Sequence, residues 1–172
     1  LSYKLEVLMR RFVNFVCGAL AFRRVKKFDL LLTVLLTILT GMFATWLVNY
    51  LIVFYPQQVP EGLESANRAI RDSEGPLLYS FLFGVCVFAP IVEELFFRGF
   101  LWWVLEKLLS ARFAFAITTV LFAMAHLDVL HVIAVFPLGL LFGFLRLRTK
   151  SLWAPLLAHA LNNTLASINL VL

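Results

Sequence analysis

The fold class is set by one stretch of sequence, LLLTVLLTILTGMFATWLVNYLIVF, which occupies residues 30–54. It contains no charged residue, and about 20 apolar residues suffice for a helix to cross the hydrocarbon core of a bilayer. The whole chain of 172 residues is 62% hydrophobic and 15% charged, whereas soluble domains are about 45–50% apolar and roughly 25% charged. The composition therefore excludes an ordinary soluble domain and predicts an all-α, polytopic integral membrane helix bundle.

Outward from this span, the apolar runs that follow predict four more transmembrane helices. We expect them at residues 77–104, 113–128, 130–146 and 152–172. On the other side, residues 1–27 mix apolar and charged side chains and end in a basic cluster, which is typical of an amphipathic helix lying in the membrane interface. We therefore predict a single domain of about five transmembrane helices in three parts: the interfacial segment 1–27, the first span with an acidic loop at 28–76, and a core at 77–172.

The distribution of charge predicts the orientation of these helices. Basic residues cluster at 23–27, 107–112 and 146–150, whereas the loop at 56–76 is acidic. Short cytoplasmic loops carry an excess of Lys and Arg, so we expect the basic clusters in the cytoplasm and the acidic loop outside. The same rule accounts for the net charge of +5, which therefore does not indicate nucleic-acid binding. The chain begins with Leu1 instead of Met, and we expect residues before it.

Polar groups are predicted inside three of the spans, where each charged residue costs at least about 2.5–3.5 kcal/mol. These groups are Glu93, Glu94, Arg98, His126, His159 and Asn163. From a rise of about 1.5 Å per residue, Glu93 lies roughly 18 Å from the cytoplasmic boundary, His126 roughly 21 Å and His159 roughly 14 Å. Three helices thus bring polar groups to one layer, which indicates a functional site near the middle of the bilayer. The alternative is a structural ion pair with packed histidines.

The local spacing supports such a site. Glu94 and Arg98 are four residues apart, and so are His159 and Asn163, so each pair shares one helix face. Glu94 and Arg98 can therefore neutralise each other. Pro90 lies one turn before Glu94, and proline removes a helical hydrogen bond, so we expect a kink or loosening of the helix there.

Three further features of the predicted spans are an unpaired glutamate, a pair of glycines and two polar residues near a membrane boundary. Glu93 is turned by about 100° from its neighbour and has no obvious cationic partner. Gly139 and Gly143 form a pair of small residues that should let the fourth span pack closely against another helix. Asp128 and His131 are predicted at the outer interface, where polar residues cost little, so we do not assign them to the site.

Three segments in chain order carry a resemblance to a known family. They are EELFFR at 93–98, FAMAH at 122–126 and HALNN at 159–163. These segments resemble the EExxxR, FxxxH and HxxxN motifs of the CPBP intramembrane proteases. That family comprises the type II CAAX prenyl endopeptidases and their bacterial relatives, including abortive-infection and bacteriocin-immunity proteins. The resemblance covers roughly residues 77–172, implies the bacterial cytoplasmic membrane as the location, and suggests that a terminal helix is missing from this short chain.

The resemblance implies a role for each motif residue. Glu93 would activate the hydrolytic water with help from His126, and Glu94 would pair with Arg98 to hold the site together. His159 and Asn163 would stabilise the oxyanion that forms when water attacks a peptide carbonyl, because donors fixed in a dry site stabilise developing charge strongly. We therefore predict that these six residues are catalytic and that the reaction needs no cofactor.

Zinc remains the alternative to a glutamate acting alone. A site of Glu93, His126 and His159 could hold the metal, but the sequence has no HExxH motif and its two histidines come from different predicted helices. The glutamate mechanism is therefore the preferred prediction.

We predict an intramembrane endopeptidase whose partners are membrane lipid and a membrane-associated peptide or protein substrate. The alternative is a catalytically silent membrane partner or an immunity-type subunit of a larger assembly. A transporter would also bury carboxylates, but it needs a polar path across the membrane, and the sequence offers one polar layer. Prenylation of the substrate is typical of the eukaryotic relatives and is not assumed here.

Overall fold

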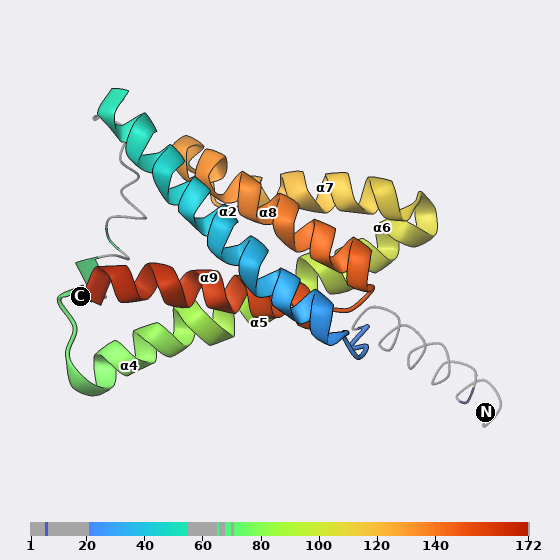
Figure 1. Cartoon of the computed structure of the whole chain (residues 1–172), viewed down its shortest axis with the longest axis horizontal. Helices are drawn as coiled ribbons and strands as arrows, with labels where there is room; N and C mark the ends of the chain where they lie inside the picture. Colours follow the sequence, from blue (N-terminus) through green and yellow to red (C-terminus); the bar gives the residue numbers. More distant parts are fainter. Residues whose placement is uncertain (1–5, 7–20, 55–64, 66–67, 70, 172) are drawn as a thin grey trace.

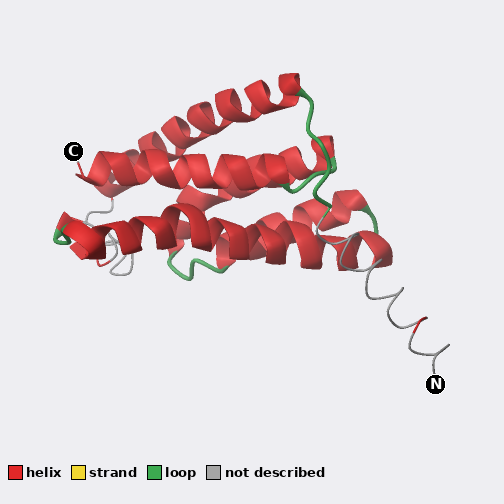
Figure 2. Ribbon diagram, turned by 90° about the horizontal axis from the view of Figure 1, so that it is seen from below, coloured by secondary structure: helices red, strands yellow, loops and turns green. Residues whose placement is uncertain are grey.

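In the part that it describes, the computed structural model of the chain consists of helices joined by short loops, and no strand occurs there (Figure 2). This part comprises residues 6, 21–54, 65, 68–69 and 71–171. The expected interfacial helix at 1–27 falls largely outside the described residues. The all-α fold class that the composition predicts is confirmed.

One long helix at residues 75–108 is built from α-helical and π-helical segments in succession, and separate α-helices precede and follow it (Figure 1). The elements in chain order are α2 (Lys27–Phe54), α4 (Gly75–Phe83), the π-helical η2 (Gly84–Phe88), α5 (Ala89–Glu94), the π-helical η3 (Leu95–Leu101), α6 (Trp102–Leu108), α7 (Ala111–Met124), α8 (Val129–Thr149) and α9 (Trp153–Val171). A proline, Pro76, lies in the first turn of α4, where the second span begins.

Helix α2 lies across α8 and α9, and its face toward them carries small and hydroxyl side chains (Figure 1). The hydroxyls of Thr33 and Thr37 donate to the backbone carbonyls four residues earlier, each at 2.7 Å. A threonine bonded to its own helix leaves no polar group unsatisfied in an apolar interface. At Gly41 an added Cβ would lie 3.0 Å from Oδ1 of Asn162 on α9, so the missing side chain permits the close approach of these two helices.

Helices α7 and α8 pack closely through the predicted pair of glycines. A Cβ at Gly143 would lie 2.8 Å from the ring of Phe115, and a Cβ at Gly139 would lie 3.2 Å from the ring of Phe122. Small residues allow helices to approach in membranes, where packing and hydrogen bonds hold helices together. The expectation of close packing at this pair is confirmed.

Three described helices are long and apolar enough to cross a membrane: α2, the composite helix at 75–108, and α8. The span expected at 113–128 is shorter in the structure, because α7 ends at Met124 after 14 residues. At 1.5 Å per residue such a helix is only about 21 Å long, against about 30 Å for the hydrocarbon core. The placement of His126 inside a helix was therefore wrong, and the count of five spans stays a prediction.

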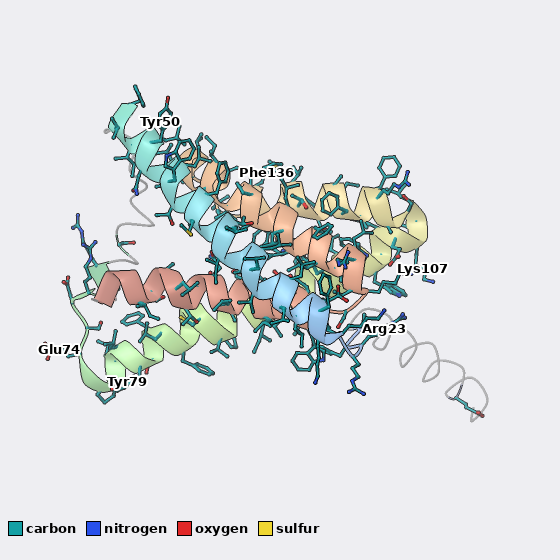
Figure 3. All side chains as sticks on the ribbon, viewed as in Figure 1. Arg23, Tyr50, Glu74, Tyr79, Lys107 and Phe136 are labelled. Atoms are coloured by element: carbon teal, nitrogen blue, oxygen red, sulfur yellow. The ribbon has the colours of Figure 1, made fainter. Side chains whose placement is uncertain are left out.

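The basic clusters gather at one end of the bundle, and the segment before α4 lies at the other end (Figure 1). Arg23 and Lys107 lie at one end, and Glu74 lies at the other (Figure 3). At the basic end, an ion pair of 2.8 Å between Asp29 and Arg148 joins the start of α2 to the end of α8. The basic clusters thus share one end, as the charge pattern predicts. The side of the membrane that this end faces stays a prediction.

Candidate active site

The composite helix presents two consecutive glutamates from the short α-helical segment α5, between two π-helical segments. In η2 the hydrogen bonds reach back five residues, since the N–H of Ala89 donates to the carbonyl of Gly84. The next carbonyl in that register is that of Val85, and its partner would be the nitrogen of Pro90, which has no hydrogen. The predicted loosening next to Pro90 thus takes the form of a π-helical segment with one free carbonyl.

Asn163 on α9 bonds this free carbonyl. Its Nδ2 donates to the oxygen of Val85 at 2.9 Å, which satisfies a backbone group that the helix itself cannot satisfy. An amide nitrogen carries two hydrogens, so one donor of Asn163 is used here and one is left. Asn162 donates to Oδ1 of Asn163 at 3.4 Å, and this contact holds the amide with its nitrogen toward Val85. The sequence analysis gave Asn162 no part in the site.

Glu94 and Arg98 form the buried ion pair that their spacing predicts. The distance between Arg98 Nη1 and Glu94 Oε1 is 3.1 Å, and the two side chains are 0% and 1% exposed. Arg98 Nη2 also donates to the carbonyl of Gly139 on α8 at 3.1 Å, so the guanidinium joins two helices. Glu94 Oε2 and Arg98 Nε are buried and have no hydrogen-bond partner within the described residues. This pair serves as the anchor of the site.

His159 lies between the two glutamates. Its Nδ1 is 3.0 Å from Oε1 of Glu94, and its Nε2 is 3.9 Å from Oε2 of Glu93. An ionised carboxylate can only accept a hydrogen bond, so the nitrogen at Glu94 carries a hydrogen. A carboxylate behind an imidazole fixes its tautomer and its orientation. Glu94 therefore orients His159 so that its second nitrogen faces Glu93.

Glu93 differs from its neighbour in exposure. Its side chain is 33% exposed, against 1% for Glu94. The distance of 3.9 Å to His159 is too long for a hydrogen bond, so the carboxylate of Glu93 keeps its accepting capacity. Of the two glutamates, Glu93 is the one that can meet a water molecule or a substrate.

His126 lies in the turn that follows α7, and its Nδ1 is 3.0 Å from the carbonyl oxygen of Phe122. A carbonyl only accepts, so Nδ1 carries the hydrogen and Nε2 is left as an acceptor. The ring of His131 packs edge-on against His126 with a centroid separation of 4.6 Å. Asp128 caps α8 by accepting from the backbone N–H of His131 at 3.1 Å. The sequence analysis set His131 aside as interfacial, yet it lies beside a candidate site residue.

Phe122 forms the floor beneath these groups, and sequence reasoning gave it no role beyond its place in a motif. The guanidinium carbon of Arg98 lies 4.1 Å from its ring centroid, which is a cation–π contact. Its ring also meets the rings of His126 and His159 edge-on, at 5.4 and 5.7 Å. The ring of Phe142 stacks on His159 at 4.7 Å. The only sequence signal for these contacts of Phe122 is its position four residues before His126.

The structure thus brings Glu93, Glu94, Arg98 and His159 together, and Asn163 joins η2 one turn further along α9. Among the described residues, no three His, Cys, Asp or Glu side chains lie in an arrangement suited to a metal ion. Nδ1 of His159 is held by Glu94 at 3.0 Å, and its Nε2 lies 3.9 Å from Glu93. The donor set of the zinc alternative, Glu93, His126 and His159, is therefore not assembled in this arrangement.

Comparison with known proteins decides the family. The family described as Type II CAAX prenyl endopeptidase Rce1-like matches residues 75–165, which is more than half of the chain. The chain belongs to the Rce1-like family. All three motif segments fall within the matched residues, so the resemblance to the CAAX-type proteases is confirmed, and with it the assignment as an integral membrane protein.

One curated relative comes from Bacillus subtilis (strain 168) and is named "Putative membrane peptidase YdiL". It is 35% identical over 82 residues, which cover 48% of this chain and 34% of the relative. The chain thus matches about a third of that protein's length. No solved structure matches the chain.

Proposed function

We propose that this chain is an intramembrane peptidase in which Glu93 activates the water that hydrolyses a peptide bond. The observation that carries the proposal is the placement of His159 between a buried glutamate at 3.0 Å and a partly exposed one at 3.9 Å. One carboxylate orients the imidazole, and the other faces the accessible side with its oxygens available. Membership of the Rce1-like family supports the same reaction class.

In the proposed reaction, a water molecule donates a hydrogen bond to the carboxylate of Glu93. The carboxylate takes the proton as the water oxygen bonds to the peptide carbonyl carbon, whose oxygen becomes an oxyanion. As the C–N bond breaks, Glu93 returns the proton to the departing nitrogen, and a carboxylic acid and an amine result.

The oxyanion needs donors, and two groups of α9 are suited to supply them. Asn163 keeps one amide hydrogen after its bond to Val85. His159 has Nε2 on the side of Glu93, so it can donate from this nitrogen when the ring is protonated. Loss of one such donor typically lowers the rate by about 10²–10³. His126 leaves Nε2 as an acceptor, and we assign it a supporting role in holding the water.

The proposed substrate is a peptide at or in the membrane, and the basic end of the bundle is proposed to face the cytoplasm of a bacterial cell. Purified protein in liposomes should be assayed with a farnesylated peptide ending in a CAAX sequence and with the same peptide without its prenyl group. Cleavage by the wild type that disappears in Glu93→Gln is the expected result. Equal cleavage by the Glu93→Gln variant would refute the assigned base. Absence of cleavage by the wild type would favour the catalytically silent partner instead.

A further inference from the structure

A cavity of about 130 Å³ lies at the basic end of the bundle, and neither Glu93 nor Glu94 lines it. Its lining includes Arg23 from the segment before α2, Arg146 and Lys150 from the end of α8, and Glu106 from α6. Three cationic groups and one carboxylate leave a net charge of +2 around this space. A cavity with uncompensated positive charge is suited to an anion.

Arg146 is built into the wall of this cavity. Its side chain is among the buried charged groups, with 5% of the residue exposed. Its Nε donates to the backbone carbonyl of Arg98 at 2.9 Å, and its guanidinium lies 5.7 Å from the ring centroid of Trp102. Both contacts fix the side chain. A fixed guanidinium is pre-organised to bind phosphate oxygens through its remaining donors.

The segment that contributes Arg23 is also held in place. Ser151 Oγ donates to the carbonyl of Arg23 at 2.7 Å, and the N–H of Leu152 donates to the carbonyl of Ala21 at 3.2 Å. These bonds join residues 21–23 to the turn between α8 and α9. Arg23 and Lys150 therefore reach the same cavity as a consequence of the fold.

We propose that this cavity binds the phosphate group of an anionic membrane lipid. Basic pockets between transmembrane helices near the membrane boundary are suited to lipid headgroups. The apolar surroundings favour a lipid over free phosphate. Phe22 stands in the chain between the lining residues Ala21 and Arg23, and it forms an exposed aromatic pair with Trp153, with ring centroids 4.8 Å apart. Acyl chains can cover this pair while the headgroup enters the cavity.

The test compares two double variants that lose the same charge. Arg23→Gln with Lys150→Asn removes two of the three cations of the cavity. Arg146 is retained, because its loss would leave the carbonyl of Arg98 without its hydrogen-bond donor. Asparagine is chosen because Lys150 has φ +53°, a left-handed conformation that Asn tolerates. The control is Lys26→Gln with Lys27→Gln, two exposed residues of the same end that do not line the cavity.

The melting temperature of each purified protein is measured in detergent with phosphatidylglycerol, with phosphatidylcholine and with inorganic phosphate. Phosphatidylglycerol at 100 times its Kd should raise the wild-type Tm by about 5–10 °C. The control variant should keep this rise, and the cavity variant should lose most of it. Phosphatidylcholine should have little effect on any of them.

Three results would overturn the proposal. These are the absence of a phosphatidylglycerol effect on the wild type, an equal loss of the effect in both double variants, and an equal Tm rise with inorganic phosphate alone. The last would assign the cavity to a free anion. The Glu93→Gln variant should respond to phosphatidylglycerol as the wild type does, so this test does not depend on the proposed peptidase activity.

Discussion

Replacing Glu94 with alanine removes an acceptor that two buried donors share. Arg98 donates to Oε1 of Glu94 at 3.1 Å, and His159 Nδ1 lies 3.0 Å from the same oxygen. In Glu94→Ala the guanidinium keeps only its bond to a carbonyl of α8 and its contacts with aromatic rings. It then carries an uncompensated charge in the interior of the bundle. His159 loses the group that orients it.

The expected cost follows from burial. Breaking a buried ion pair by removing one partner costs about 3–5 kcal/mol. For chains of 150–250 residues, 1 kcal/mol corresponds to about 2–4 °C in Tm, so Glu94→Ala should lower Tm by about 6–20 °C. Glu93→Gln replaces a partly exposed carboxylate that lies 3.9 Å from Nε2 of His159, too far for a hydrogen bond. Substitutions at such positions usually stay within about 0.5 kcal/mol, so its Tm should fall by no more than about 2 °C.

The assay combines thermal unfolding in detergent with hydrolysis of the farnesylated CAAX peptide in liposomes. Glu94→Ala should lose both stability and activity, whereas Glu93→Gln should lose activity alone. Glu94→Gln serves as a matched control, because it keeps the shape of the side chain and an accepting oxygen and should recover part of the stability. Indistinguishable melting temperatures for Glu94→Ala and Glu93→Gln would refute the division of roles between the two carboxylates.

Four further predictions test the topology, the packing and the chemistry. In a background without native cysteines, a cysteine at position 25 should be labelled from the cytoplasm and one at position 66 from outside; labelling from one side only would contradict the charge-based orientation. Gly143→Ala would place Cβ 2.8 Å from a neighbouring ring, whereas Gly84→Ala meets nothing within 4 Å. Gly143→Ala should therefore lower the free energy of unfolding by about 1–3 kcal/mol, and Gly84→Ala should lower it much less. Equal losses in the two variants would contradict the close packing of α7 and α8. Asn163→Ala should lower kcat by about 10²–10³, and a change in KM alone would argue against an oxyanion donor. Metal analysis of the purified protein should show no stoichiometric zinc, and prolonged chelation should leave activity unchanged. Stoichiometric zinc whose removal stops turnover and whose return restores it would exclude the glutamate-only mechanism.

The sequence predicts those parts of the site that depend on spacing within one helix. The Glu94–Arg98 contact follows from four residues of separation, and the close packing of α8 against α7 follows from the pair Gly139 and Gly143. Both are local consequences of helix geometry, which a sequence specifies directly. The motifs also identify the family, because their order and residue types are specific.

Other parts depend on contacts between helices that no spacing specifies. A helical wheel of residues 77–104 assumes a uniform 3.6 residues per turn, whereas η2 and η3 wind differently on both sides of Glu93 and Glu94. The position of Glu93 near His159 therefore could not be derived from its rotation relative to Glu94. His126 was assigned to a helix because the apolar run continues past Met124, although the helix ends there.

The contacts of Phe122 have a consequence for any mutational study of this site. Its ring lies against a guanidinium and two imidazoles that belong to three different motifs. Groups that share a packed neighbour commonly show interaction energies of about 0.5–3 kcal/mol. Effects of substitutions at His126 and His159 should therefore be non-additive in a double-mutant cycle, and this coupling should shrink when the cycle is repeated in a Phe122→Leu background. The three motifs then respond to substitution as one packed unit around the ring of Phe122, and not separately.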